Sequence, residues 1–173
     1  TAIDFDGTDD YLCTDTNDDD TCDDNNNFDF ASADNFSAGM WVKMNTATAT
    51  QVLMIKYDNT NPYWAIWLTS DGKPYLNIRD SGGITSSTTG IGEIDDNRWH
   101  QVVGVRDVST DKLSFYIDGL LVSSITDTTT ATMANAASFN IGRSTTGTAY
   151  QFTGSIDEPF VTAEALTGSQ IKR

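Results

Sequence analysis

Carboxylates are concentrated in one short segment near the N-terminus. Asp15, Asn17 and Asp19 place oxygen-bearing side chains at alternating positions, a spacing typical of oxygen-rich calcium loops. An EF-hand loop needs Gly at its sixth position and Glu at its twelfth, but the sequence has Asp20 and Asn26 there. The segment is therefore expected to be either an irregular calcium loop or a solvated acidic insertion.

Two cysteines, Cys13 and Cys22, flank most of this acidic segment, and the chain contains no others. In an oxidising compartment a pair at this spacing predicts a disulfide. A zinc site would need more ligands, and the single histidine, His100, is distant in the sequence. Closing so short a loop contributes about 2.5–3 kcal/mol in the chain-entropy model, enough to hold mutually repelling carboxylates together.

Three aromatic side chains are candidates for binding a ligand. Trp41, Trp67 and Tyr116 fall on the opposite side of their expected strands from the aliphatic residues. Carbohydrate sites use such rings, because an aromatic face stacks on the C–H face of a pyranose while nearby polar groups fix its hydroxyls. Packing in the core is the alternative for each ring.

The elements that must position these residues are strands. Phe36, Ala38, Met40 and Val42 alternate with polar or small neighbours, which predicts a half-buried strand. Similar patterns predict strands at Gln51–Tyr57, Tyr63–Thr69, Lys73–Arg79, Trp99–Arg106, Lys112–Ile117, Leu120–Thr126, Ser138–Gly142 and Gln151–Val161. The fold class is therefore all-β, a two-sheet antiparallel β-sandwich, and the length favours a single domain over residues 1–173.

Turn residues separate these strands. Asp71-Gly72 and Asp118-Gly119 each lie between apolar strands, which predicts type I′ hairpins. Ile84–Gly92 and Thr126–Ala137 are rich in small and polar residues and are expected to be surface loops. The end of the chain holds at most one or two helical turns, with Gly168 as the expected breaker.

The charge and hydropathy of the chain exclude several functions. With 25 acidic and 10 basic side chains, the formal charge is −15, which disfavours nucleic acid and anionic membranes as partners. No apolar run reaches the length of a membrane span, and no signal-peptide pattern is present, so we expect no membrane insertion. We interpret the chain as a mature product or an excised domain of a larger protein.

Five segments together carry a family resemblance. Arg98–Val105, Leu113–Val122 and Phe152–Val161 follow one another in the C-terminal third, and Ala2–Tyr11 and Phe36–Lys43 precede them. Over nearly the whole chain this order resembles the laminin-G-like jelly roll of the concanavalin A-like lectin and glucanase superfamily. The resemblance implies a jelly roll, but folds of this kind host many functions.

The resemblance also implies a second candidate cation site. In such domains calcium often lies near the rim of a sheet, and the matching acids here are Asp6, Asp9 or Asp10, and Asp157. Alternatively, these carboxylates accept backbone hydrogen bonds at strand ends without a metal. The resemblance further implies that Trp99 is buried and that a short helix follows the last strand.

Glucanases of this superfamily carry Glu-x-Asp-x-x-Glu on one strand, because a retaining mechanism needs two carboxyl groups about 5–5.5 Å apart. The nearest string begins at Glu93 and has Arg98 in place of the second Glu, so we expect its acids to cap a loop. His100 has no evident nucleophile partner. The sequence therefore predicts a chain that is not an enzyme.

These observations favour a non-catalytic, extracellular recognition module that binds a glycan or another cell-surface polymer with the help of calcium. A protein-adhesion or structural spacer domain is the alternative, and a glycoside hydrolase is a third. We expect the ligand on a sheet face or rim near the cation, with the Cys13–Cys22 loop and at least one of Trp41, Trp67 and Tyr116 contributing.

Overall fold

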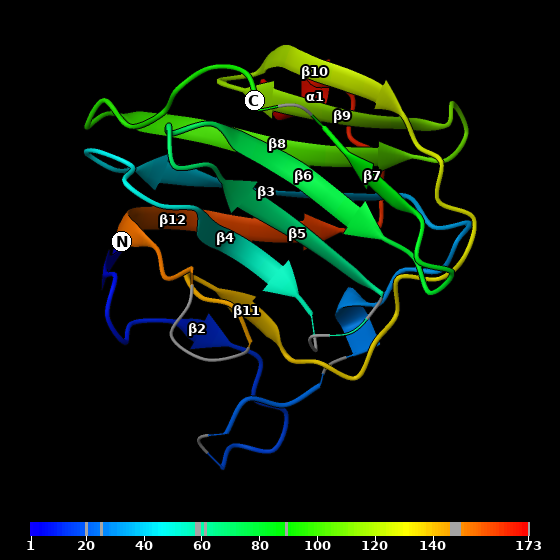
Figure 1. The fold of residues 1–173 in the computed structure, drawn as a ribbon, viewed down its shortest axis with the longest axis horizontal. Coiled ribbons are helices and arrows are strands. Elements are labelled where there is room, and N and C mark those ends of the chain that lie inside the picture. The colour runs from blue at the N-terminus through cyan, green and yellow to red at the C-terminus, as the bar shows by residue number, and fades with distance from the viewer. Residues whose placement is uncertain are drawn as a thin grey trace.

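As predicted, the chain folds into two antiparallel sheets (Figure 1), and each has six strands in the part that the structure describes. The structure, a computed structural model, describes residues 1–19, 21–24, 26–57, 60, 62–88, 90–145 and 150–172. Asp20, used in the EF-hand comparison, lies outside these residues. Within the described part of the chain, no helix is long and apolar enough to cross a membrane.

Both sheets contain strands from distant parts of the sequence. The first sheet has the order β1 (Ile3–Asp6), β12 (Thr153–Thr162), β3 (Phe36–Lys43), β8 (Trp99–Asp107), β9 (Lys112–Ile117) and β10 (Leu120–Thr126). The second has the order β2 (Leu12–Cys13), β11 (Phe139–Ile141), β4 (Gln51–Lys56), β5 (Tyr63–Leu68), β6 (Pro74–Arg79) and β7 (Thr85–Ser87). The helical segments are η1 (Asn26–Phe28) and α1 (Gly168–Ile171).

One apolar cluster between the sheets contains the inward residues of both. In β3 the predicted inward residues Phe36, Ala38, Met40 and Val42 are buried in this cluster, but Ser37 and Gly39 on the other side are buried as well, so the strand is more than half-buried. Trp64 from β5 packs against Phe36 with ring centroids 5.5 Å apart. The core thus fixes which face of each strand remains available for binding.

The two Asp-Gly hairpins differ. Asp118 and Gly119 both have positive φ, at 51° and 71°, so the type I′ turn between β9 and β10 is confirmed. Between β5 and β6 only Gly72 has positive φ, and Thr69 N–H donates to Lys73 O at 3.0 Å. The type I′ prediction is therefore wrong for this longer loop, in which Asp71 keeps a negative φ.

Three other expectations require correction. The segment expected to be an Ile84–Gly92 loop contains β7, whose central Ser86 is buried and bonds to Thr128. Gly168 begins α1 instead of ending a helix, and Thr167 N–H is capped by the Gln170 side chain at 2.9 Å. Trp99 is 39% exposed, because it lies on the outer face of its sheet.

A buried lysine attaches the N-terminal segment to the second sheet. Lys56 is the last residue of β4, and its side chain is fully buried. Its Nζ lies 2.6 Å from Asp24 Oδ1 and 3.1 Å from Asp29 Oδ1, and it donates to the carbonyls of Asn135 and Ala137. The lysine is satisfied by these oxygens, and it fixes the chain just after the acidic loop.

Candidate metal-binding loop and ligand-binding face

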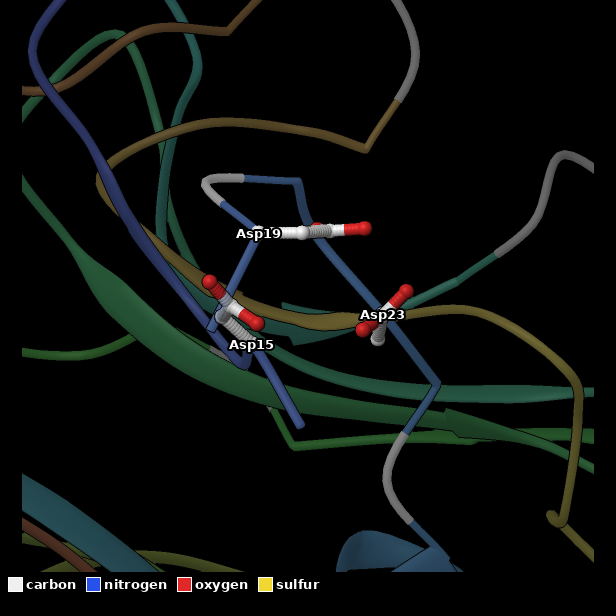
Figure 2. Close-up of side chains that lie close together, drawn as sticks. All are labelled: Asp15, Asp19 and Asp23. Carbon is white, nitrogen blue, oxygen red and sulfur yellow. The ribbon is translucent and has the colours of Figure 1, made fainter. Parts of the chain in front are cut away.

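Three carboxylates converge in the acidic loop that follows β2. One ligand atom from each of Asp15, Asp19 and Asp23 lies within 4.8 Å of the others (Figure 2). Within the described residues this is the one group of three or more acidic, histidine or cysteine side chains gathered so closely. The sequence analysis missed Asp23, although its position four residues after Asp19 continues the spacing from Asp15.

Hydrogen bonds within the loop orient these carboxylates. Asp15 Oδ1 accepts the N–H groups of Asn17 at 3.1 Å and Asp18 at 2.8 Å. Asp19 Oδ1 accepts Thr21 N–H at 3.0 Å, and Asp23 Oδ2 accepts the Thr16 hydroxyl at 3.1 Å. Each bond uses a carboxylate oxygen as acceptor. Asn17 thus contributes its backbone N–H to these bonds.

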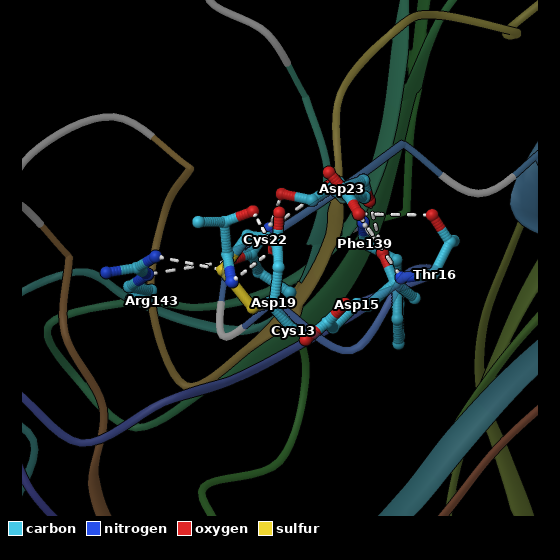
Figure 3. Close-up of a disulfide and its surroundings, with 12 residues drawn as sticks. Cys13, Asp15, Thr16, Asp19, Cys22, Asp23, Phe139 and Arg143 are labelled. Carbon is cyan, nitrogen blue, oxygen red and sulfur yellow. Dashed lines mark hydrogen bonds between the residues drawn. A yellow bond between two sulfur atoms is a disulfide. The ribbon is translucent and has the colours of Figure 1, made fainter.

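The disulfide closes the loop as predicted. Cys13 and Cys22 are joined with their Cα atoms 5.6 Å apart (Figure 3). Asp23 N–H donates to Thr14 O at 2.7 Å next to this link. Arg143 Nη2 approaches Cys22 Sγ at 3.5 Å, and its guanidinium stacks on the Tyr11 ring, so a cation adjoins the acidic loop.

Among the other predicted cation ligands, Asp157 does not join Asp6, Asp9 and Asp10. Asp6 Oδ1 accepts Thr8 N–H at 2.7 Å and Asp10 Oδ2 accepts Asp6 N–H at 2.9 Å, so both carboxylates accept backbone hydrogen bonds within one turn. Asp9 lies exposed in the same turn. Asp6 pairs with Thr153, whereas Asp157 lies four residues farther along β12, opposite Trp41. The strand register therefore separates Asp157 from the N-terminal acids.

The three predicted ligand-binding rings lie on both sides of the sandwich. Trp41 and Tyr116 are on the outer face of the first sheet, and Trp67 is on the outer face of the second. Tyr116 packs with Ile171 in a cluster that includes the C-terminal segment. The structure therefore does not combine these rings into one site.

Trp67 belongs to a larger group that we term the aromatic face. Four rings and three polar residues line a hollow of about 390 Å³: Tyr63, Trp67, Tyr75, Tyr150, Thr50, Asn77 and Ser87. Strand register brings them together, because Trp67 pairs with Tyr75 across β5 and β6. The sequence analysis missed Tyr63, Tyr75 and Tyr150 as a group, although alternation with buried residues marks Tyr63 and Tyr75 as outward.

Contacts between the rings hold the aromatic face in shape. Trp67 and Tyr150 meet edge to face, with centroids 5.3 Å apart and planes at 90°. The hydroxyl of Tyr63 donates to Asn77 Oδ1. Burial raises the pKa of Tyr63 and of Tyr75 above the ordinary phenol value, so both remain protonated donors at neutral pH. The hollow thus combines apolar ring surfaces with directional hydroxyl and amide groups.

The aromatic face and the acidic loop are separate. The loop follows β2, the edge strand of the second sheet (Figure 1). The hollow is lined mainly by residues of β5 and β6. Strands β11 and β4 lie between β2 and β5. A ligand bound over β5 and β6 would therefore lie apart from a cation held by Asp15, Asp19 and Asp23.

A family model described as Concanavalin A-like lectin/glucanases superfamily matches residues 6–172. No curated protein gives a significant match. Among solved structures, the chain is similar to the binding domain of Paraclostridial Mosquitocidal Protein 1, with a TM-score of 0.71 and 16% identity, over 99% of this chain and 46% of that one. The chain thus spans less than half of that binding domain.

Two further solved structures share the fold. One is the CBM40 of the Ruminococcus gnavus IT-sialidase bound to alpha2,3 sialyllactose, with a TM-score of 0.64 and 15% identity, over 83% of this chain and 90% of that one. The other is a heptameric SAP-like pentraxin from Limulus polyphemus, with a TM-score of 0.69 and 15% identity, over 99% and 79%. At these identities the similarity establishes the fold alone.

Proposed function

The chain belongs to the Concanavalin A-like lectin/glucanases superfamily, and from this premise we propose that it is a non-catalytic binding module whose ligand is a carbohydrate. The observation that carries the proposal is the aromatic face. Its rings offer apolar area for stacking on a pyranose, and Asn77, Ser87 and Thr50 offer hydrogen-bonding groups at the same hollow. A sugar needs both kinds of contact.

The ligand is a neutral sugar in preference to a polyanionic one. The formal charge of −15 repels anions over the whole surface. The residues that line the hollow carry no charge at neutral pH, so they offer no local compensation. The CBM40 and toxin binding domains with this fold are consistent with a binding role, without indicating the same ligand.

The acids near Glu93 support a non-catalytic role. Asp95 Oδ2 accepts Ala47 N–H at 3.2 Å, and Asp96 Oδ1 accepts Arg98 N–H at 3.0 Å. These aspartates stabilise the loop before β8, and Ile94 between them and Glu93 is fully buried. This arrangement supports a role for these acids in capping the loop, and not as the general acid and nucleophile of a retaining glycosidase.

Calcium is the second part of the proposal, in a structural role. Asp15, Asp19 and Asp23 supply hard oxygen donors of the kind calcium takes, and water would complete six to eight ligands. Because this loop is separate from the aromatic face, the role of the ion is to stabilise the loop and not to contact the sugar. We further propose an extracellular setting, which the disulfide supports, within a larger protein.

A test of glycan binding distinguishes the carbohydrate-binding module from the alternative, a protein-adhesion or spacer domain. A glycan array probed with and without chelator should identify a carbohydrate ligand, and its affinity is then measured by calorimetry. Removing a ring by Trp67→Ala or Tyr150→Ala should weaken binding by about 1–3 kcal/mol, the scale of burying a large apolar side chain. Tyr150 is 48% exposed, so its replacement should leave the fold intact.

Trp41→Ala is the matched control, because it removes an equally large ring from the opposite sheet. The proposal predicts unchanged sugar affinity for this variant. If no glycan binds, the adhesion or spacer alternative is favoured. If the Trp41→Ala and Trp67→Ala variants both remain folded and lose sugar affinity equally, the assigned face is contradicted.

A further inference from the structure

A second hollow lies on the outer face of the first sheet, remote from the aromatic face. It has a volume of about 320 Å³, and Trp41, Trp99, Asp157 and Glu158 line it. We propose that this hollow, termed the indole–acid site, binds an organic ammonium group, such as a methylated amine. Its position on the opposite sheet makes it independent of the carbohydrate proposal.

Strand register places the two indoles together. Trp41 pairs with Gln101 and Lys43 pairs with Trp99, so the indoles are diagonal neighbours on β3 and β8. Diagonal positions are about 7–8 Å apart, within reach of aromatic side chains. Asp157 on β12 pairs directly with Trp41. Two ring systems and a carboxylate therefore project from three adjacent strands on one face.

Both indoles present exposed ring surface at this site. Trp41 is 36% exposed and Trp99 is 39% exposed, whereas Trp64 is fully buried in the core. In the described part of the chain, the one cation that stacks on an aromatic ring is Arg143, on Tyr11. Neither indole face is thus used by a described cation of the chain, and an indole face attracts cations more strongly than other rings do.

A β-bulge sets the position of the second carboxylate. Pairing of β12 with β3 shifts register between Asp157 and Phe160, and Glu158 has a φ of 48° immediately before Pro159. A left-handed conformation at a non-glycine residue is sterically disfavoured and persists only where the surrounding structure holds it, as is common at functional sites. Asp157 Oδ1 accepts Glu158 N–H at 2.9 Å, which stabilises this geometry.

The charges at the site favour a cation. Glu158 forms no ion pair with any described residue, and Asp157 is approached by the Thr1 ammonium at 3.9 Å. Besides this ammonium, the cations nearby include Lys43, which pairs with Trp99 in register, and Lys172, which lines the adjoining hollow with Trp41 and Glu158. Arg98, which precedes Trp99, lies 3.7 Å from Asp96. A ligand with both positive charge and apolar substituents satisfies the acids and the indoles together, whereas a neutral sugar satisfies only the rings.

Choline and its uncharged carbon analogue, in which a quaternary carbon replaces the nitrogen, provide a matched pair of probes. They have the same shape and differ in charge. Binding is followed by NMR through the indole N–H signals at constant ionic strength. We expect choline to shift the signals of Trp41 and Trp99 but not those of Trp64 and Trp67, and to bind at least about threefold more tightly than the analogue.

Variants assign the site. Trp41→Ala and Trp99→Ala should each weaken choline binding by about threefold or more, the lower end of the cation–π range. Glu158→Gln should weaken it as well, whereas Glu164→Gln, which removes the same charge from another exposed position, should not. Trp67→Ala is the control for indole loss on the opposite sheet.

Equal binding of choline and its analogue would overturn the proposal. Equal effects of Glu158→Gln and Glu164→Gln would also overturn it, because they would indicate nonspecific attraction to an acidic protein. The NMR shifts in the unaltered protein decide the question even if a tryptophan variant fails to fold, and the absence of shifts at both indoles would contradict the site.

Discussion

His100 Nδ1 lies 2.8 Å from Asp118 Oδ2, the carboxylate of the type I′ turn that joins β9 and β10. The other ring nitrogen, Nε2, lies 3.1 Å from Asp96 Oδ1. A neutral imidazole can donate through one nitrogen only, so contact with two carboxylates favours the imidazolium form. Burial lowers the pKa of His100, but its bonds to Asp118 and Asp96 outweigh this effect and raise the pKa above 6.5.

This histidine makes stability depend on pH. A raised folded-state pKa means that the stabilisation is fully present below about pH 6.5 and is lost as pH rises through the folded-state pKa. His100 is the only histidine, so NMR titration of its ring should give one curve with a midpoint above 6.5. A midpoint at or below that value would contradict the ion-pair geometry.

Urea unfolding of His100→Gln checks the energetic consequence. At pH 6 the variant should be less stable by about 1 kcal/mol, since the acids are largely exposed and solvent screens them. The difference should shrink as pH rises. The loss of stability should be similar at all pH values if packing alone is responsible.

The disulfide should resist alkylation and contribute to stability. Intact mass after alkylation without reductant should show no added label at Cys13 or Cys22. A Cys13→Ser/Cys22→Ser variant should lose about 2.5–3 kcal/mol of unfolding free energy in the chain-entropy model. Labelling of both thiols in the untreated protein would refute the link.

Calcium should raise the melting temperature. An ion that binds only the native state stabilises it by mass action, and it also relieves repulsion among Asp15, Asp19 and Asp23. Melting in excess calcium and in excess chelator, at constant ionic strength, should differ by several degrees. Asp23→Asn should reduce this difference, whereas Asp9→Asn, outside the group, should not. Equal melting temperatures under both conditions would count against the loop site.

Arg106 should be essential for stability. Its Nε lies 2.7 Å from Asp127 Oδ2, both side chains are almost fully buried, and its Nη atoms bond to the carbonyls of Ala31, Ser32 and Asp34. Arg106→Met leaves Asp127 buried without its partner and should cost about 3–5 kcal/mol in urea unfolding. Arg106→Met/Asp127→Leu should recover part of the loss. A change below 1 kcal/mol for Arg106→Met would show that solvent replaces the arginine.

The sequence determined the strands and the short-range links. Alternation of apolar and polar residues predicted most strand positions, because successive side chains in a strand point to opposite faces of the sheet. The pairing of Cys13 with Cys22 followed from their isolation and short separation. The jelly-roll resemblance is confirmed by the family match over residues 6–172.

Only the tertiary structure decided how outward residues combine. Parity showed that Trp41 and Trp67 point away from aliphatic neighbours, but not that they lie on opposite sheets, since strand pairing between distant segments decides that. Likewise, Tyr150 meets Trp67 through a contact between residues far apart in the chain. The pattern within one strand fixes the direction of a side chain, whereas its neighbours from distant segments depend on which strands pair.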